Sequence, residues 1–217
     1  MIIQVWRRAV EANVGRVVVA SGDAEIADVV LAAGGDAVMT DPGLPSGSDR
    51  IFEALQTIDP GEEFSRVINL QGDLPNIEPH ALKKVLKLLD NPAVDIGTLA
   101  AKIENEEELY DPNVVKVVAG LDGNASVARG LYFTRALAPA GDGEYWHHIG
   151  IYAYQRSALE RFVRLKPSPL ELREKLEQLR ALEAGMRIDV ARVTMVPLGV
   201  DTPADLEKAR HIFTSEN

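Results

Sequence analysis

The 217-residue sequence predicts an α/β protein with an open, mostly parallel sheet and a small antiparallel annex. Up to about Asn91, short apolar segments alternate with amphipathic ones, as in βαβ units. The segment 67–71 carries no charge, which is typical of a strand buried on both faces of a parallel sheet. After Asn91, strand-like segments follow one another without long helices between them, which indicates antiparallel pairing.

The first part of the chain is expected to alternate between helices and strands. Apolar residues at helical spacing predict a helix over residues 1–13, which Gly15 ends. The same helical spacing of apolar residues recurs in three later segments. Short apolar segments that favour β-strands lie between them. The further expected helices are 23–33, 48–58 and 78–89, and the expected strands are 16–20, 37–40 and the segment around Ile68.

The second part is expected to be richer in strands. Residues 93–155 form the predicted antiparallel annex, within a single domain that spans residues 1–217. The expected strands are 94–103, 114–118, 128–134, 146–154 and 188–193, and the expected helices are 104–110, 156–165, 170–184 and 202–213.

Composition narrows the classes of function. The net charge of −10 argues against a nucleic-acid partner, which requires a basic face, and a polyanionic substrate would need metal ions or a local cluster of cations. No apolar run approaches the ~20 residues of a membrane span. The sequence has no cysteine, and Met1 leads straight into an amphipathic pattern, so a cytoplasmic location is expected.

Two aspartates are candidate metal ligands. Asp73 follows the strand around Ile68, and in open α/β sheets ligands bind beyond the carboxyl ends of the strands. Carboxylates in that position commonly hold Mg²⁺ for a nucleotide, although Gly72-Asp73 is equally typical of a plain turn. Asp201 precedes Thr202, the expected N-cap of the last helix, so capping does not require Asp201. It is the second candidate.

The segment Ser46-Gly47-Ser48 opens an expected helix. Ser46 and Asp49 have the spacing of a capping box, so a well-capped helix accounts for these residues. The alternative is functional, because the free N–H groups at a helix N-terminus can receive a phosphate, ribose or base.

For several other polar residues, the sequence allows both a structural and a functional interpretation. His147 and His148 lie in a strand, where adjacent side chains point to opposite faces, so the pair cannot chelate one metal. Arg135 ends a strand and could bind a carboxylate or form a surface salt bridge. Glu177 and Gln178 fall in a charged helical run that is typical of a solvated face.

Eight segments in this order resemble the 3-deoxy-manno-octulosonate cytidylyltransferase (CMP-Kdo synthetase) family. No single segment is specific, but their order along essentially the whole chain is. They are PSGSDR (45–50), NLQGDLP (69–75), DPNVVK (111–116), LYFTRA (131–136), HIGIY (148–152), PSPLE (167–171), LEQLR (176–180) and GVDTP (199–203).

The resemblance implies a Rossmann-like nucleotidyltransferase, and it implies which reaction the enzyme catalyses. The anomeric hydroxyl of Kdo attacks the α-phosphate of CTP, pyrophosphate leaves, and the product serves lipopolysaccharide biosynthesis. Mg²⁺ is the implied cofactor, and a cytoplasmic homodimer formed through residues 93–155 is the implied assembly. By position, the metal and catalytic residues are Asp73 and Asp201, the nucleotide contacts are Ser46, Gly47, Ser48 and Gln71, and the sugar contacts are Arg135, His148, Tyr152, Glu177 and Gln178.

The sequence departs from the family pattern in two ways. Leu74 stands where many members have an acid. The family also opens with a strand and a cationic phosphate-binding loop, whereas this sequence opens in the following helix, so either the sequence is incomplete or the protein is truncated. We expect these 217 residues alone to bind CTP poorly and not to turn over. Two rival hypotheses remain: a CMP-sugar synthetase of the sialic acid type, which the segments from Arg135 to Gln178 disfavour, and a non-catalytic dimeric binding scaffold.

Overall fold

The computed structural model describes residues 1–121, 123–200 and 202–215. The chain divides into two compact units. Unit 1 comprises Met1–Glu63, Leu70–Lys83 and Pro197–Asn217, and unit 2 comprises Phe64–Asn69 and Lys84–Val196. Among the described helices, none is long and apolar enough to cross a bilayer.

Unit 1 is built on a short parallel pair of strands, β1 (Val18–Ser21) and β2 (Asp36–Met39). Between them in sequence runs α2 (Ala24–Ala32), which begins where the Asp23 side chain accepts from the Glu25 N–H at 2.8 Å. This strand–helix–strand unit is the one that the sequence predicts. The other helices of the unit are α1 (Ile2–Ala12), α3 (Gly47–Ile58), the first part of α4 (Pro79–Lys87) and α9 (Pro203–Ser215).

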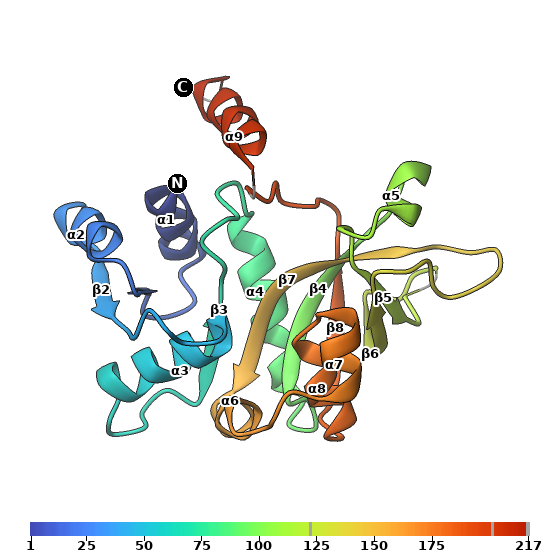
Figure 1. Ribbon diagram of the computed structural model, residues 1–217, viewed down its shortest axis with the longest axis horizontal. Helices are drawn as coiled ribbons and strands as arrows, with labels where there is room; N and C mark the ends of the chain where they lie inside the picture. Colours follow the sequence, from blue (N-terminus) through green and yellow to red (C-terminus); the bar gives the residue numbers. More distant parts are fainter. Residues whose placement is uncertain (122, 201, 216–217) are drawn as a thin grey trace. The chain divides into compact units, whose positions relative to one another are not determined.

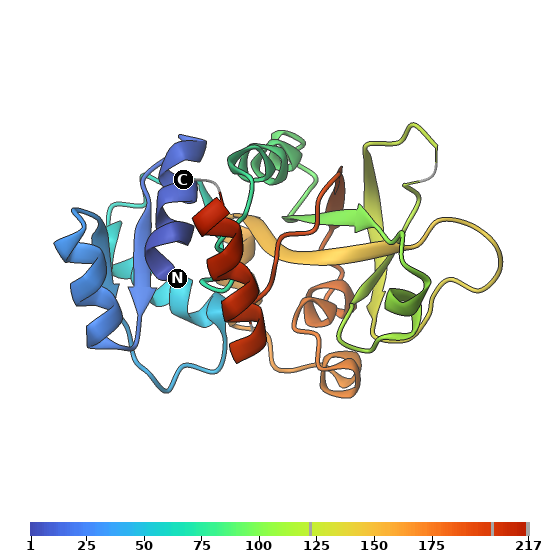
Figure 2. The ribbon, with the colours of Figure 1, turned by 90° about the horizontal axis from the view of Figure 1, so that it is seen from above.

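Helix α1 packs close to the start of β2. A Cβ atom added to Gly35 would lie 2.8 Å from Cε2 of Trp6, so only glycine fits beneath this indole. In Figure 2, α1 and α2 are the dark blue and blue helices beside the β1–β2 pair. The apolar face of α1 that the sequence predicts is therefore a packing face, with Val5, Ala9 and Ala12 buried.

Unit 2 is organised around a six-stranded sheet in the order β3-β7-β4-β8-β6-β5. An additional β7–β5 pairing joins the two ends of the run β7-β4-β8-β6-β5. Strand β7 is the long gold strand of Figure 1 and pairs with β3, β4 and β5. The strands are β3 (Arg66–Asn69), β4 (Ile96–Lys102), β5 (Lys116–Ala119), β6 (Val127–Thr134), β7 (Trp146–Gln155) and β8 (Ile188–Val193).

The α/β class and the antiparallel pairing of β5, β6 and β7 agree with the sequence prediction. The predicted open, mostly parallel sheet does not: in unit 2 the described strands pair in parallel only between β4 and β8. The expected burial of the 67–71 strand on both faces is also wrong, because Val67 and Ile68 are only half-buried in β3, which pairs antiparallel with β7. Residues 96–101 of β4 form an uncharged run that is buried throughout, but such a run carries no information on strand direction. Strand β4 is in fact flanked by antiparallel β7 on one side and parallel β8 on the other.

The remaining elements of unit 2 are short helices. The predicted single helix 170–184 is wrong, because Lys175 adopts a left-handed conformation (φ 56°) and separates α7 from α8. This break lets the Glu174 side chain reach the end of β6. The helices are the η1 turn (Leu88–Asp90), α5 (Glu106–Tyr110), α6 (Arg156–Val163), α7 (Pro169–Glu174) and α8 (Gln178–Glu183).

Strand β4 lies at the centre of the unit 2 core, where its residues from Ile96 to Ala101 are all buried. A Cβ atom added to Gly97 would lie 2.8 Å from the carbonyl oxygen of Val85 and 3.1 Å from Cβ of Leu88. Backbone cannot give way as the tip of a side chain can, so Gly97 is required by this close approach.

We expect Gly97→Ala to lower the free energy of unfolding by about 1–3 kcal/mol, the usual cost of overpacking a core. Urea unfolding followed by circular dichroism measures this. Gly120→Ala is the matched control, because a Cβ atom there meets nothing within 4 Å, and its change should stay within about 0.5 kcal/mol. Equal effects of the two substitutions would contradict the packing argument.

Candidate functional site

The N-terminus of α3 carries the first group of predicted residues. The Ser46 hydroxyl donates to the Asp49 carboxylate at 2.6 Å and accepts from the Asp49 N–H at 3.2 Å. The capping interpretation of the sequence is therefore confirmed for Ser46. Gly47 and Ser48 form the first turn of α3, and Ser48 is buried.

The loop before α3 is held by two side chains of that helix, Arg50 and Glu53. Arg50 Nη1 donates to Thr40 Oγ1 at 2.6 Å and to the Asp41 carbonyl at 3.2 Å, and the Glu53 carboxylate accepts from the Asp41 N–H at 2.9 Å. These contacts fix the end of β2 against the helix that Ser46 caps.

The turn that holds Gln71 and Asp73 is bound to the segment before Asp201. The Val200 N–H donates to the Asp73 carbonyl at 3.0 Å, and the Leu198 N–H donates to Asn76 Oδ1 at 2.8 Å. Gln71 and Asp73 are half-buried. Asp201 itself lies outside the described residues, and the described ones contain no group of three His, Cys, Asp or Glu residues placed to hold a metal ion.

In unit 2 the two adjacent histidines of β7 have different surroundings, as the alternation of strand residues predicts. His148 is 7% exposed, and its ring lies 4.9 Å from that of Phe133 and 5.5 Å from that of Tyr152, centroid to centroid. His147 Nδ1 lies 4.0 Å from the Glu108 carboxylate. Burial lowers the pKa of His148 to about 3, with a smaller contribution from His147, so His148 is a neutral ring.

A bulge in β7 accounts for the closeness of His148 and Tyr152. Thr98 pairs with Tyr152 but Leu99 pairs with Ile149, so Gly150 and Ile151 are extra residues on the β7 side. In a regular strand two residues four positions apart are separated by ~13 Å. The bulge shortens this separation, and both rings lie in one aromatic row that continues to Tyr154 and Phe162.

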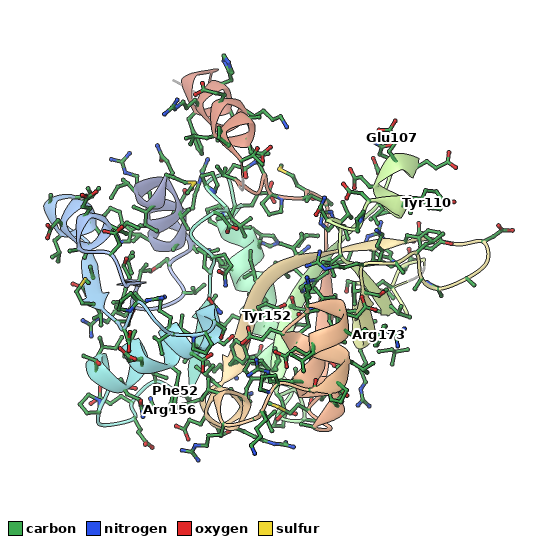
Figure 3. All side chains as sticks on the ribbon, viewed as in Figure 1. Phe52, Glu107, Tyr110, Tyr152, Arg156 and Arg173 are labelled. Atoms are coloured by element: carbon green, nitrogen blue, oxygen red, sulfur yellow. The ribbon has the colours of Figure 1, made fainter. Side chains whose placement is uncertain are left out.

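Tyr152, labelled on β7 in Figure 3, is half-buried and is linked electrostatically to α8. Burial raises its pKa well above the usual tyrosine value, and Tyr154 and the Glu177 carboxylate add to the increase. The phenol therefore keeps its proton. Gln178, beside Glu177, is 6% exposed, and its amide nitrogen has no hydrogen-bond partner among the described residues.

Arg135 is more strongly anchored than the sequence suggests. Its Nε donates to the Glu174 carbonyl at 3.0 Å, its Nη1 donates to the Pro112 carbonyl at 2.8 Å, and its backbone N–H donates to the Glu174 carboxylate at 3.0 Å. The Arg135 guanidinium is therefore bound to two backbone carbonyl groups and does not form the surface salt bridge that the sequence offered as an alternative. The hydrogen bonds found among the described residues use Nε and Nη1, so the Nη2 group still has donors for a carboxylate.

These contacts show which predicted residues come together. In unit 1, Ser46, Gly47 and Ser48 share the α3 N-terminus, while Gln71 and Asp73 share the turn bound to Val200. In unit 2, His148 contacts Tyr152, and Tyr152 is coupled to Glu177, whose neighbour is Gln178. Arg135 is joined instead to α7 through Glu174.

Comparison with known proteins places this chain among the cytidylyltransferases. Residues 1–188 match the Cytidylyltransferase family. The chain is 64% identical over 213 residues to the 3-deoxy-manno-octulosonate cytidylyltransferase of Rhodopseudomonas palustris strain HaA2, covering 98% of this chain and 86% of the relative. The enzyme of Bradyrhizobium sp. strain ORS 278 is also 64% identical, covering 99% and 87%. This chain belongs to the 3-deoxy-manno-octulosonate cytidylyltransferase family.

A solved structure supports the same assignment. The chain matches CMP:2-keto-3-deoxy-manno-octonic acid synthetase complexed with CTP with a TM-score of 0.89 and 38% identity, over 100% of this chain and 88% of that one. The resemblance drawn from the eight ordered segments is therefore confirmed, as is the assignment to the nucleotidyltransferase enzymes.

Sequence reasoning missed the structural roles of three residues that organise this cytidylyltransferase. Thr98 and Glu174 bind β7 and β6 through their side chains, and Lys116 is fully buried with Nζ donating to the Asp111 carbonyl at 2.7 Å. Burial lowers the pKa of Lys116, and the nearby carboxylates of Asp111 and Glu108 oppose that shift. One signal was available, since Gly150 inside a strand pattern indicates a bulge.

The neutral, buried His148 predicts a pH dependence of stability. Its folded pKa of about 3 lies below the ordinary value of 6.5, so only the unfolded chain takes up a proton as the pH falls below 6.5. The contribution of the neutral His148 to the free energy of unfolding is therefore fully present above pH 6.5 and is lost as the pH falls toward 3. Between pH 7 and 4.5 the wild type should lose about 2–3 kcal/mol more than His148→Gln. Urea unfolding at both pH values measures it; identical losses would show that His148 titrates normally.

Proposed function

We propose that this family member transfers CMP from CTP to the anomeric hydroxyl of Kdo, and that the predicted residues bind the nucleotide, the metal and the sugar. The observation that carries the proposal is the 64% identity over 98% of the chain to enzymes named for this transfer. The hydroxyl oxygen of the sugar forms a bond to the α-phosphorus, the bond from that phosphorus to the pyrophosphate oxygen breaks, and the hydroxyl proton is released. The product serves lipopolysaccharide biosynthesis.

The N-terminus of α3 and the 71–73 turn form the nucleotide side of the reaction. The first-turn N–H groups at Gly47 and Ser48 suit an anionic or polar part of CTP, because helix N-termini favour negative charge. The capped geometry at Ser46 fixes where that helix begins. Gln71 supplies an amide with both a donor and an acceptor, which is suited to a nucleotide base or ribose.

Asp73 and Asp201 are the proposed ligands of Mg²⁺. The donor set fits, because Mg²⁺ takes oxygen ligands and is usually bound by one or two carboxylates plus substrate phosphates. The bond between Val200 and the Asp73 carbonyl supports the pairing, since it ties the segment before Asp201 to the Asp73 turn. When bound, the metal offsets the charge that develops on the phosphate oxygens.

The sugar side is proposed to comprise Arg135, His148, Tyr152, Glu177 and Gln178. Kdo has one carboxylate and several hydroxyls. Arg135 matches the carboxylate through its remaining Nη donors. The neutral His148 and the protonated Tyr152 can each exchange a hydrogen bond with a hydroxyl, and the buried Gln178 amide nitrogen has a donor to offer.

A cytoplasmic homodimer, with residues 93–155 as the contact region of a single-domain protomer, completes the proposal. Support comes from β6, where Val127 and Leu131 are 48% and 63% exposed. Large exposed apolar side chains suit a protein contact. Analytical ultracentrifugation of the wild type and of a Leu131→Lys variant tests the assembly.

Pyrophosphate release tests the reaction. The wild-type protein is assayed with CTP, Kdo and Mg²⁺, then with a sialic acid in place of Kdo, and then with a chelator in place of Mg²⁺. Release only when Kdo and Mg²⁺ are both present would support the proposal, and it would show that the expectation of poor CTP binding by these 217 residues is wrong. Release with the sialic acid would favour the rival CMP-sugar synthetase, and binding of Kdo or CTP without turnover would favour a non-catalytic scaffold.

We expect Asp73→Asn to lower kcat by ~10²-fold or more, which is the usual effect of removing electrostatic stabilisation at a reacting phosphate. The amide keeps the size of the side chain, so the free energy of unfolding should change little. Asp90→Asn is the matched control, since Asp90 is an exposed partner of Arg66. A kcat near the wild-type value in Asp73→Asn would remove Asp73 from the metal site.

Arg135→Ala should raise the KM for Kdo far more than that for CTP, by about 10-fold or more for loss of a charge-assisted pair to the sugar carboxylate. It should also lower stability by about 1–3 kcal/mol, because the Glu174 and Pro112 carbonyls lose their donors. Arg173→Ala, an exposed arginine of α7 labelled in Figure 3, is the control and should change neither quantity. Equal changes in both KM values would make Arg135 a structural residue.

A further inference from the structure

Thr98 lies at the bulge between β4 and β7 with none of its surface exposed. Three groups surround its hydroxyl oxygen. The carbonyl oxygen of Ile151 lies 2.9 Å away, the carbonyl oxygen of Ile149 lies 3.2 Å away, and Nε2 of His148 lies 3.0 Å away. The distances to Ile151 and His148 are those of ordinary hydrogen bonds, and the contact to Ile149 is longer and therefore weaker.

The hydroxyl has one proton for these three neighbours. Both carbonyl oxygens can only accept, so the Thr98 proton must point at one of them or be shared between the two. If it pointed at His148 instead, two carbonyl oxygens would face the hydroxyl lone pairs at 2.9 and 3.2 Å without a proton between them. Oxygen lone pairs that face one another at these distances without a proton between them repel, so this orientation is strongly disfavoured. The hydroxyl therefore donates to carbonyl oxygen and accepts from Nε2–H of His148.

The ring of His148 cannot adopt another arrangement easily. Phe133 meets it edge-on at 4.9 Å with an interplanar angle of 75°, and Tyr152 contacts it at 5.5 Å. The backbone N–H of His148 donates to the Val115 carbonyl at 2.8 Å. A neutral imidazole carries one proton, so a proton on Nε2 leaves Nδ1 as an acceptor. Among the described residues, no hydrogen bond to Nδ1 is found.

We propose that Thr98 is a positioning residue that holds His148 in the Nε2–H tautomer, so that Nδ1 accepts a hydrogen bond from a hydroxyl group of Kdo. The identity of the ligand rests on the proposed function, whereas the choice of tautomer rests on the bulge alone. Tyr152 is the next residue along the same aromatic row, so a hydroxyl bound at Nδ1 belongs to the sugar side of the reaction.

The first experiment reads the tautomer directly in the whole protein without substrate. Long-range ¹H–¹⁵N correlation spectra at pH 7 distinguish protonated from unprotonated ring nitrogens, and His148→Gln identifies the His148 signals by their loss. The wild type and Thr98→Ser should show protonated Nε2 and unprotonated Nδ1. Thr98→Val, which keeps the shape but removes the hydroxyl, should lose this single tautomer. A wild-type spectrum with protonated Nδ1, or an unchanged spectrum in Thr98→Val, would overturn the proposal.

The second experiment separates positioning from general structural damage. In pyrophosphate release, Thr98→Val should raise the KM for Kdo about fivefold, as for loss of one neutral hydrogen bond, and leave the KM for CTP unchanged. Thr98→Ser should restore the wild-type value. Thr57→Val is the matched control, because Thr57 is an exposed threonine of α3 whose hydroxyl donates only to the Glu53 carbonyl among the described contacts.

The outcomes of the two experiments are separable. A changed tautomer with an unchanged KM for Kdo, or equal changes in the KM for Kdo and for CTP, would overturn the role of Nδ1 in sugar binding. Failure of the wild type to release pyrophosphate with Kdo would count against the proposed function, and the spectra would still decide whether Thr98 selects the tautomer.

Discussion

The central constraint in unit 2 is that the backbone of β7 must satisfy its hydrogen bonds while pairing with three other strands. A regular ladder cannot include the extra residues Gly150 and Ile151, and the resulting bulge brings the carbonyl oxygens of Ile149 and Ile151 next to the Thr98 hydroxyl. The single proton of this hydroxyl is available to that pair of acceptors. The same irregularity brings His148 and Tyr152 together, so the candidate sugar-binding side chains depend on how this one strand resolves its backbone pairing.

Side-chain hydrogen bonds and ion pairs also hold the ends of other strands and helices in unit 2. Glu174 accepts from Tyr132, Thr134 and the Arg135 N–H, which secures the end of β6, and burial with the Glu174 charge raises the pKa of Tyr132. Arg180 and Glu171 form a two-pronged pair across the α7–α8 break, with both side chains about one-tenth exposed. A chain of net charge −10 therefore uses its buried cations to bind carbonyl and carboxylate oxygens within the fold.

Much of the secondary structure could be predicted because it depends on local chemistry. The apolar face of α1, the Asp23 cap of α2 and the Ser46 cap of α3 are encoded within a few residues. The direction of β4 could not be predicted, because burial of both faces looks the same whether the neighbouring strand is parallel or antiparallel. The break at Lys175 was missed because nothing in the local helical pattern marks it, and the contacts of Glu174 beside it are with β6, far away in the sequence.

Eight ordered segments of the sequence identify the family, and local patterns identify the helix caps, the positions of most elements and the candidate site residues. The protonation states and neighbours of those residues follow only from the folded structure. Burial in β7 makes His148 neutral, the β4–β7 bulge sets its neighbours, and two distant carbonyl groups anchor Arg135. The reason is physical: a pKa, a tautomer or a spare donor depends on which groups lie within ~3–6 Å in space, and for these residues most of those groups are remote in the sequence.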